Sequence, residues 1–353
     1  MNNNRLIKTG ISQGDINGIS YELILKTFED ARIFELCIPV LYGSSKTLAY
    51  HRKALDLPPV NFSNISTPGD AGINRLNIIN SDNREINVEL ASATQESEQA
   101  ATKALQQAFQ DLKQKNIDVL VTAPANLNEM SIIEDSSLKD HLNLLVYNSF
   151  RVAIATDKIP LNEISSLLTT DYLSKKIKML HSVLVRDFMI TIPRIAVLSF
   201  NPGVGIKEQR FEKEETETII PAIQSVAKEG ILCFGPYAAE SLFDSDDYKN
   251  FDAILAIYND QGQLPFRTLS NGEGVLYRAN PKYVMTTPDQ SVSYEKAGKN
   301  NSNEAAFRNA IYTALDIFRN RKIDAEINAN PLKKLYFERG SDNEKLDLTA
   351  DED

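Results

Sequence analysis

Polar side chains able to bind a ligand or move a proton follow a short apolar run, residues 254–258, in the stretch FDAILAIYNDQGQLPF. The run has the length and composition of a strand that is buried on both faces of an α/β sheet. Asn259, Asp260, Gln261 and Gly262 follow it directly, and open parallel sheets bind their ligands beyond the carboxyl ends of the strands. We therefore expect a site here, although an ordinary polar loop with a glycine turn explains the same residues equally well.

The same arrangement, a predicted strand followed by polar residues, recurs along the chain. The residues concerned are Asp15 and Asn17 after residues 6–11, Thr122 within 117–124, Asp157 and Lys158 after 151–156, and Asn201 after 194–200. The first of these turns is rich in glycine and precedes a predicted helix, so it suits an anion, but a plain tight connection fits it too. If the fold brings these strand ends together, they line one cleft that binds a small polar ligand.

Histidine and cysteine supply no evident metal site or nucleophile. The histidines, His51, His141 and His181, are not spaced three or four residues apart, and none lies at the end of a predicted strand. His51 and His181 lie among basic residues on predicted helices, as solvated or packed side chains. Cys37 and Cys233 lack metal-like spacing and are expected to be buried thiols. Walker A and nucleophile-elbow motifs are absent as well.

Composition is typical of a globular protein, which we expect in the cytoplasm. The 353 residues suit two domains, and the formal net charge of -10 argues against nucleic-acid and membrane partners. No apolar run is long enough to span a bilayer, and the first residues lack a secretory signal. Residues 331–353 form an acidic tail whose end we expect to be disordered.

Helical and strand patterns alternate throughout, which predicts an α/β protein with mainly parallel strands. Apolar residues recur at helical spacing between 104 and 112, in 171–188 and in 304–319. Thr94 alone, or Ser92 with Gln95, is expected to cap the first of these helices. The stretch 127–150 has no clean periodicity and stays unassigned.

Taken in order, these segments resemble the 4-hydroxythreonine-4-phosphate dehydrogenase family of the vitamin B6 pathway. The resemblance is carried by ISQGDINGISYELILKTF, IDVLVTAP, RVAIAT followed by IPL, RIAVLSFNP, FDAILAIYNDQG and TTPDQSVSYEKAGK. It implies a fold like that of isocitrate and isopropylmalate dehydrogenases, with two α/β domains, a cleft between them and a homodimer that completes each site. It also implies NAD- or NADP-dependent oxidation of a phosphorylated hydroxy amino acid, assisted by a divalent metal and followed by decarboxylation.

The sequence departs from the family where the metal binds. Family members carry three metal-binding histidines, and the matching positions here are Lys158, Gly203 and Asn259. Lysine is cationic at neutral pH, glycine has no side-chain donor atom, and the asparagine amide oxygen is a weak ligand. We therefore predict that the divalent metal is lost, and that Lys158 and Asp260 are the candidate catalytic residues.

Phosphate and cofactor residues change as well. The family's Pro-Gly-His-Thr-Glu segment has no counterpart between Asn126 and Arg151, and later phosphate positions read Arg267, Leu276 and Met285. Of these three, only the arginine can still pair with a phosphate. The family's cofactor-side Asp-His-Gly reads Asp289-Gln290-Ser291. By resemblance, the substrate-binding candidates are Asp15, Asn17, Thr122 and Arg267, and the cofactor-binding candidates are Asn201, Asp289 and Lys299.

Two classes of function follow from this pattern. One is an NAD(P)-dependent oxidoreductase, which either runs the family reaction or uses Lys158 as the positive charge in place of the metal. The other is a non-catalytic relative that serves as a binding or partner subunit. The resemblance also implies a first domain of residues 1–128 plus 268–330, a second domain of residues 129–267 that carries the cleft and the dimer surface, and a small phosphorylated or polar ligand.

Overall fold

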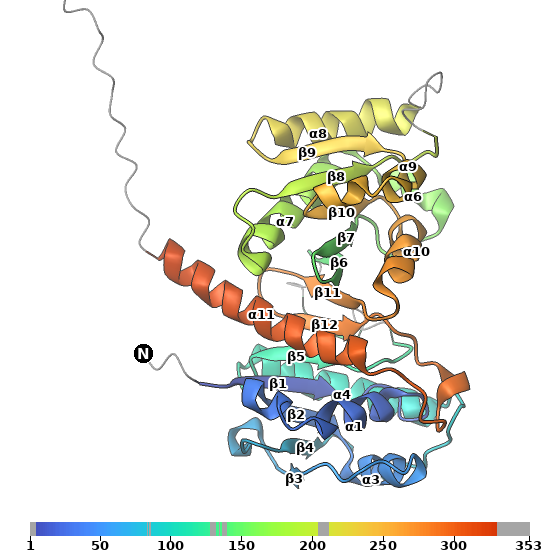
Figure 1. Ribbon diagram of the computed structural model, residues 1–353, viewed down its shortest axis with the longest axis vertical. Helices are drawn as coiled ribbons and strands as arrows, with labels where there is room; N and C mark the ends of the chain where they lie inside the picture. The colour runs from blue at the N-terminus through green and yellow to red at the C-terminus, as the bar shows by residue number, and fades with distance from the viewer. Residues whose placement is uncertain are drawn as a thin grey trace, which may run out of the picture.

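A single mixed sheet runs through the whole length of the protein in the computed structural model (Figure 1). The structure describes residues 5–329, except 83, 85, 128–131, 134, 136–139 and 204–211. Within this part the sheet has twelve strands in the order β3-β4-β2-β1-β5-β12-β11-β6-β7-β10-β8-β9. The prediction of a disordered tail at residues 331–353 lies outside the described residues.

The amino-terminal half contributes parallel strands joined by helices. Its elements are β1 (Ile7–Ser12), α1 (Ser20–Glu29), α2 (Ile33–Leu36), β2 (Cys37–Gly43), α3 (Ser45–Ala54), β3 (Phe62–Asn64), β4 (Leu76–Asn80), α4 (Gln95–Lys113) and β5 (Val119–Thr122). The hydroxyl oxygen of Thr94 accepts a hydrogen bond of 3.1 Å from the Ser97 N–H and so caps α4. This confirms one of the two predicted caps.

The remaining elements build the other half and then return to the first. They are β6 (Leu142–Tyr147), β7 (Phe150–Ile154), α6 (Leu161–Leu167), α7 (Thr170–Phe188), β8 (Arg194–Leu198), α8 (Ile220–Ala227), β9 (Leu232–Tyr237), α9 (Ala239–Asp244), β10 (Ala253–Ala256), α10 (Asn259–Ser270), β11 (Val275–Ala279), β12 (Met285–Pro288) and α11 (Ala305–Asn328). The return is made by β12, which pairs parallel with β5.

The predicted mainly parallel α/β fold is confirmed, with an antiparallel insertion at the centre of the sheet. β11 pairs antiparallel with both β12 and β6, and β6 pairs antiparallel with β7, whereas the other eight neighbouring pairs are parallel. β6 lies in the stretch that the sequence left unassigned. Both of its faces are largely covered, so its residues do not alternate between apolar and polar.

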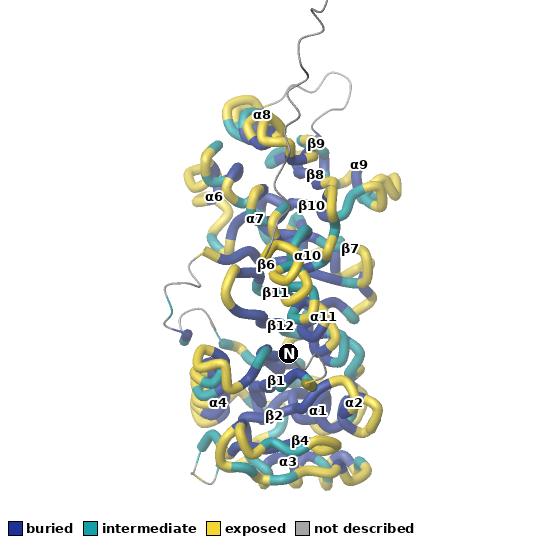
Figure 2. Tube along the Cα trace, turned by 90° about the vertical axis from the view of Figure 1, so that its left-hand side faces the viewer, coloured by how far each residue is buried: buried dark blue, intermediate teal, exposed yellow. Residues whose placement is uncertain are grey.

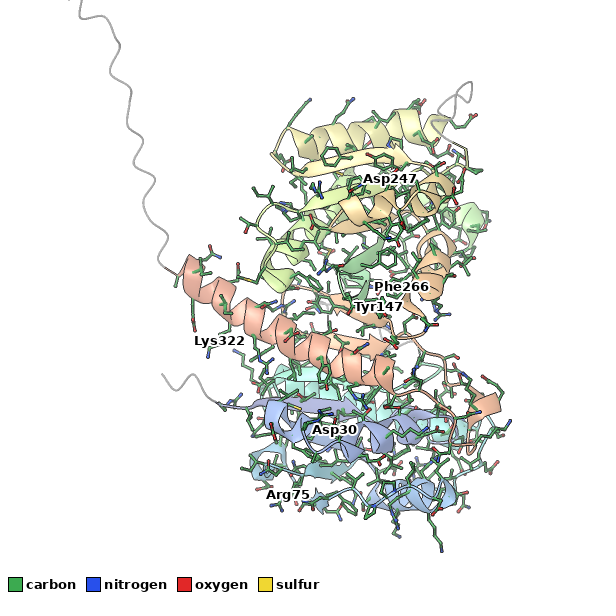
Figure 3. All side chains as sticks on the ribbon, in the orientation of Figure 1. Asp30, Arg75, Tyr147, Asp247, Phe266 and Lys322 are labelled. Atoms are coloured by element: carbon green, nitrogen blue, oxygen red, sulfur yellow. The ribbon has the colours of Figure 1, made fainter. Side chains whose placement is uncertain are left out.

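Buried residues follow the strands down the middle of the molecule, and the outer helix faces are exposed (Figure 2). Phe266 from α10 and Tyr147 at the end of β6 belong to the same hydrophobic cluster, and Figure 3 labels them next to each other. No helix in the described residues has the length and apolarity that crossing a bilayer requires.

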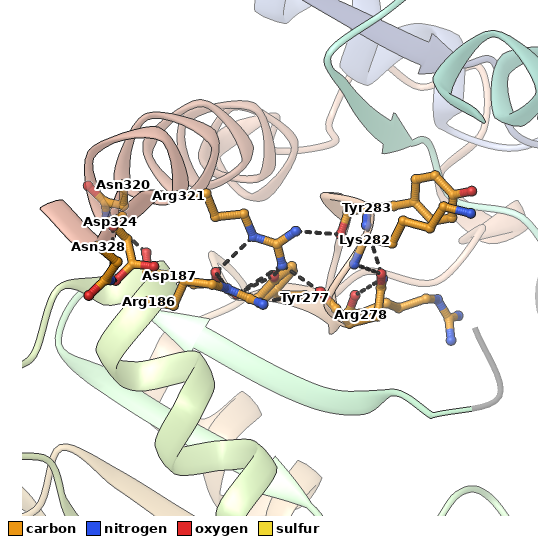
Figure 4. Close-up of polar contacts among 11 residues, drawn as sticks. Arg186, Asp187, Tyr277, Arg278, Lys282, Tyr283, Asn320, Arg321, Asp324 and Asn328 are labelled. Atoms are coloured by element: carbon orange, nitrogen blue, oxygen red, sulfur yellow. Dashed lines mark hydrogen bonds and ion pairs between the residues drawn. The ribbon is translucent and has the colours of Figure 1, made fainter. Parts of the chain in front are cut away.

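A buried charged cluster connects α7, β11 and α11 (Figure 4). The Asp187 carboxylate has no exposed surface, and it accepts hydrogen bonds from Arg186 at 2.6 Å, Arg321 at 2.8 Å and the Tyr277 hydroxyl at 2.6 Å. Burial alone would raise the pKa of Asp187, but the two guanidinium groups hold it below its usual value. The sequence pattern predicted that the last helix ends at Arg319, but α11 continues to Asn328. Arg321 lies in this additional part of the helix and binds Asp187 from there.

Candidate functional site

Three neighbouring parallel strands bring several predicted site residues to one edge of the sheet. β10 pairs with β7 on one side and with β8 on the other. Lys158 follows β7, Asp260 follows β10 and Asn201 follows β8, so these residues lie past adjacent carboxyl ends. The ends of these three strands are therefore neighbours in the sheet, and a shared site there stays a prediction.

Gln261 ties two of these strand ends together. Its side-chain oxygen accepts a hydrogen bond of 2.8 Å from the Ile257 N–H, and its side-chain nitrogen donates one of 2.6 Å to the Ser199 carbonyl. Residues 259–262 form the first turn of α10, so the alternative of an ordinary polar loop is wrong. The rigid junction fixes the direction in which the first turn of α10 presents Asp260.

The residues at the family's metal positions have few polar contacts. Lys158 is exposed and makes no hydrogen bond or ion pair with the described residues. The Asn259 amide donates to Asp260 at 3.1 Å, and the Gly203 backbone N–H donates to Glu240 at 3.0 Å. Within the described part of the chain, no group of three or more His, Cys, Asp or Glu side chains is arranged to hold a metal ion.

Asn201 is held in place by a buried carboxylate that sequence reasoning missed. Glu215 has no exposed surface and accepts hydrogen bonds of 2.9 Å from the backbone N–H groups of Phe200 and Asn201. Its second oxygen accepts a bond of 3.0 Å from the Asn201 side chain. Glu215 lies in a strongly charged run, which by pattern belongs on the surface, so only its contacts reveal its role.

A second group of predicted residues lies past β1 and β5. Asp15 is buried and accepts hydrogen bonds from the Asn17 backbone N–H at 2.8 Å and from the Tyr294 hydroxyl at 2.6 Å. The Thr122 hydroxyl lies 2.6 Å from that of Thr287. Asp15 and Tyr294 line a small cavity of about 70 Å³. Asp15 is thus a buried carboxylate on the wall of a small cavity.

Asn17 serves a structural purpose, and its placement does not support the prediction that it binds substrate. Its amide nitrogen donates to the Ser92 carbonyl and the Thr94 hydroxyl, both at 3.0 Å, and its amide oxygen accepts from the Glu89 N–H at 2.8 Å. Because the donors and the acceptor are all used within the protein, Asn17 fastens the turn to the segment that precedes α4.

Arg267 and Asp289, predicted for substrate and cofactor respectively, form an ion pair at 2.8 Å. Gln263 also donates to Asp289 at 2.7 Å, and the hydrogen bond to Asp289 raises the pKa of Arg267. Both partners line a cavity of about 360 Å³, but Lys299, the third predicted cofactor residue, is exposed and does not line it.

The same cavity contains polar groups without protein partners. The Ser302 side chain is only 5% exposed, and its hydroxyl has no hydrogen-bond partner among the described residues. The side-chain oxygen of Gln290 is likewise unpartnered there. The backbone around Ser302 is fixed, because its N–H donates to Glu22 at 2.7 Å. Buried polar atoms of this kind normally have a partner, so these two are exceptions within the described residues.

Of the three histidines, His51 is packed in the core as the sequence suggested. Its ring stacks on Tyr21 with 5.2 Å between centroids, and its Nε2 atom lies 2.8 Å from the Ile16 carbonyl. His181 is half-buried on α7. His141 directly precedes β6, and its Nε2 atom lies 3.2 Å from the Asp157 carboxylate. The sequence missed this contact because β6 itself was not predicted.

Comparison with known proteins decides the family. The model of the pyridoxal phosphate biosynthetic protein PdxA matches residues 35–314. The chain belongs to this family. A 4-hydroxythreonine-4-phosphate dehydrogenase from Bacteroides thetaiotaomicron is 44% identical over 98% of this chain and 99% of its own length. One from Sulfurihydrogenibium is 28% identical over 90% of this chain and 100% of its own.

Solved structures agree on the fold. The putative 4-hydroxythreonine-4-phosphate dehydrogenase from Salmonella typhimurium superposes with a TM-score of 0.74 at 21% identity, covering 89% of this chain and 100% of that one. The Klebsiella pneumoniae enzyme gives a TM-score of 0.73 at 20% identity, covering 90% and 99%. The resemblance to the PdxA family that the sequence motifs indicated is thus confirmed.

Proposed function

We propose that this chain is an NAD(P)-dependent oxidoreductase of the PdxA family that acts on a small phosphorylated hydroxy compound without a divalent metal. The observation that supports the proposal is the position of Lys158, Asn201 and Asp260 after the carboxyl ends of three adjacent strands. The residues at the family's three metal positions are replaced.

The residues at the metal positions do not fit a metal ion. Lys158 is an exposed ammonium with no carboxylate partner among the residues that the structure describes, and a divalent cation beside it would be repelled. The Gly203 N–H is a hydrogen-bond donor, which cannot ligate a cation. We propose that Lys158 stabilises the negative charge that develops on the substrate oxygen and that Asp260 accepts the hydroxyl proton.

We assign the cavity beside Asp289 to the polar part of a dinucleotide, because it is lined by polar side chains that include Arg267, Asp289 and Gln290. NAD(P), when bound, supplies the hydride acceptor. We propose that Asp289 supports cofactor binding indirectly, by holding the Arg267 side chain in place. We propose that Asn201 shapes the cofactor site through its backbone, and that Lys299 acts on the cofactor only through long-range charge.

Under this proposal the chain binds the substrate phosphate less tightly than family members that keep all the phosphate-binding residues. Arg267 is the remaining candidate for the phosphate, and Asp15 and Thr122 are candidates for the polar part of the substrate. Met285 is buried in the core and offers no hydrogen-bond donor to a phosphate. The proposed ligand is therefore a phosphorylated or polar hydroxy compound, with 4-hydroxythreonine 4-phosphate as the reference member of the class.

The assembly is also a proposal. We propose a first domain of residues 1–128 plus 268–330 and a second of 129–267, because β12 returns to β5. β11 pairs with β6, so the sheet itself crosses this boundary. We further propose a cytoplasmic homodimer formed through the second domain, as the resemblance implies.

The test is NADH or NADPH production from 4-hydroxythreonine 4-phosphate in the presence of EDTA. Wild-type protein should turn over slowly, and Lys158→Ala should lower kcat at least about tenfold, because one charge-assisted contact contributes about 1.5–3 kcal/mol. Lys249→Ala removes an exposed lysine elsewhere and should leave kcat unchanged. Dinucleotide binding without turnover would instead identify a non-catalytic binding subunit.

A further inference from the structure

A cavity of about 270 Å³ lies beside α7, and one of its lining residues, Asp157, directly precedes Lys158 in the chain. Polar and charged residues from three segments line it: Asp140 and His141 before β6, Asp157 after β7, and Tyr172, Lys175 and Lys176 on α7. Ile159, Leu167 and Met179 supply its apolar wall. The cavity therefore combines room for a small organic molecule with several titratable groups.

The two lysines of this cavity have different surroundings. Lys175 is 62% exposed and pairs with Asp140 at 2.6 Å. Lys176 is half-buried, forms no ion pair with the described residues, and donates to a neutral acceptor, the His141 carbonyl, at 2.9 Å. Its ammonium also lies 5.4 Å from the centre of the Tyr172 ring. Lys176 is therefore a cation in a poorly solvated place with neutral partners.

We propose that Lys176 is a carbonyl-reactive amine, and that this cavity binds a small aldehyde or ketone as an imine with its Nζ atom. The ammonium first loses a proton to solvent, and the neutral amine attacks the carbonyl carbon. The N–C bond forms, the carbonyl oxygen leaves as water with the two remaining amine hydrogens, and a C=N bond results. No oxidant or reductant is needed, and the inference does not depend on the dehydrogenase activity.

The electrostatics of the cavity agree with this assignment. Desolvation by burial lowers the pKa of Lys176, which raises the share of neutral amine at neutral pH. Asp157 and Asp140 oppose this effect, and Lys175 adds to it. His141 and the Tyr172 hydroxyl, which donates to the Ala155 carbonyl at 2.7 Å, complete the titratable groups that the described residues place around Lys176.

The experiment treats the full chain with propionaldehyde and sodium cyanoborohydride at pH 7 and locates the alkylated lysines by peptide mass spectrometry. Lys176 should be labelled faster than Lys175, because burial lowers the pKa of Lys176 and so raises its share of neutral amine. A purely structural Lys176 predicts the reverse order, since it is buried and hydrogen-bonded. Labelling of Lys176 at or below the rate of Lys175 would overturn the proposal.

Two variants sharpen the test. Lys176→Arg keeps the positive charge near the His141 carbonyl and should remove only that labelled peptide. Asp157→Asn removes a carboxylate that favours the ammonium form, so labelling of Lys176 should become several-fold faster in this variant. An unchanged or slower rate in Asp157→Asn, with an unchanged circular dichroism spectrum, contradicts the proposal.

Discussion

Replacing Asp187 by asparagine should destabilise the fold strongly. The carboxylate has no exposed surface and binds two guanidinium groups and the Tyr277 hydroxyl. Asparagine has nearly the same shape but no charge, so Arg186 and Arg321 would keep their positive charges in a largely buried place without a carboxylate. Breaking a buried pair in this way costs about 3–5 kcal/mol, whereas replacing the whole cluster by apolar residues costs far less.

Urea denaturation of wild type and Asp187→Asn measures this difference in free energy of unfolding. Adding Arg321→Met to Asp187→Asn should recover part of the loss, because one unpaired guanidinium is removed. Asp30→Asn is the matched control: Asp30 binds Arg32 through two nitrogens, like the buried cluster, but on the surface (Figure 3), so no measurable change is expected. Equal effects of the two Asp→Asn changes would refute the reasoning.

The pH dependence of the same variant supplies an independent check. The folded-state pKa of Asp187 lies below its usual value of 3.8, so the unfolded chain binds the proton more readily. The contribution of Asp187 is therefore present above pH 3.8 and is lost as the pH falls below it. Asp187→Asn should lack this part of the acid dependence, and an acid profile identical to that of the wild type would contradict the assignment.

Three further changes test separate parts of the structure. Gly14→Ala should cost about 1–3 kcal/mol of stability, because φ is +68° and a Cβ atom would lie 2.6 Å from the Pro124 carbonyl oxygen; urea midpoints measure it. Glu215→Gln should weaken dinucleotide binding and lower the free energy of unfolding by about 2 kcal/mol, because the new amide nitrogen would face the Asn201 amide nitrogen, which now donates to Glu215. Calorimetry that gives wild-type values would contradict this. Burial lowers the pKa of His51 from 6.5 to about 4, so the contribution of His51 to stability is present above pH 6.5 and is lost as the pH falls toward 4. In His51→Gln the free energy of unfolding should therefore change less between these two pH values. An unchanged pH dependence in this variant would contradict the prediction.

Sequence patterns located the strand ends well because both the buried runs and the residues that follow them are local features. The strand before Asn259 and the grouping of Lys158, Asn201 and Asp260 follow from such runs together with the rule for parallel sheets. The pattern did not reveal that Asn259 begins α10, because a strand can pass directly into a helix without an obvious capping residue.

Non-local features explain the rest of the differences. β6 was missed because both of its faces are largely covered, and β9 because Gly235 and Pro236 interrupt it. Glu215 stands in a charged run, and only its contacts with the end of β8 show that it is buried. The cavity around Lys176 depends on β6, so it was beyond reach once that strand was missing. The structural contacts of Asn17 were not predicted because its partners lie more than seventy residues away.

Calorimetric titration with Mn²⁺ or Zn²⁺ tests the loss of the metal site most directly. We expect no tight binding to the wild-type chain, and one metal ion per chain once Lys158→His, Gly203→His and Asn259→His are combined. The triple variant should gain little turnover, because Leu276 and Met285 still occupy phosphate positions and the non-reacting phosphate helps to position the alcohol. One tightly bound metal ion per wild-type chain, lost on Asp260→Asn, would contradict the account.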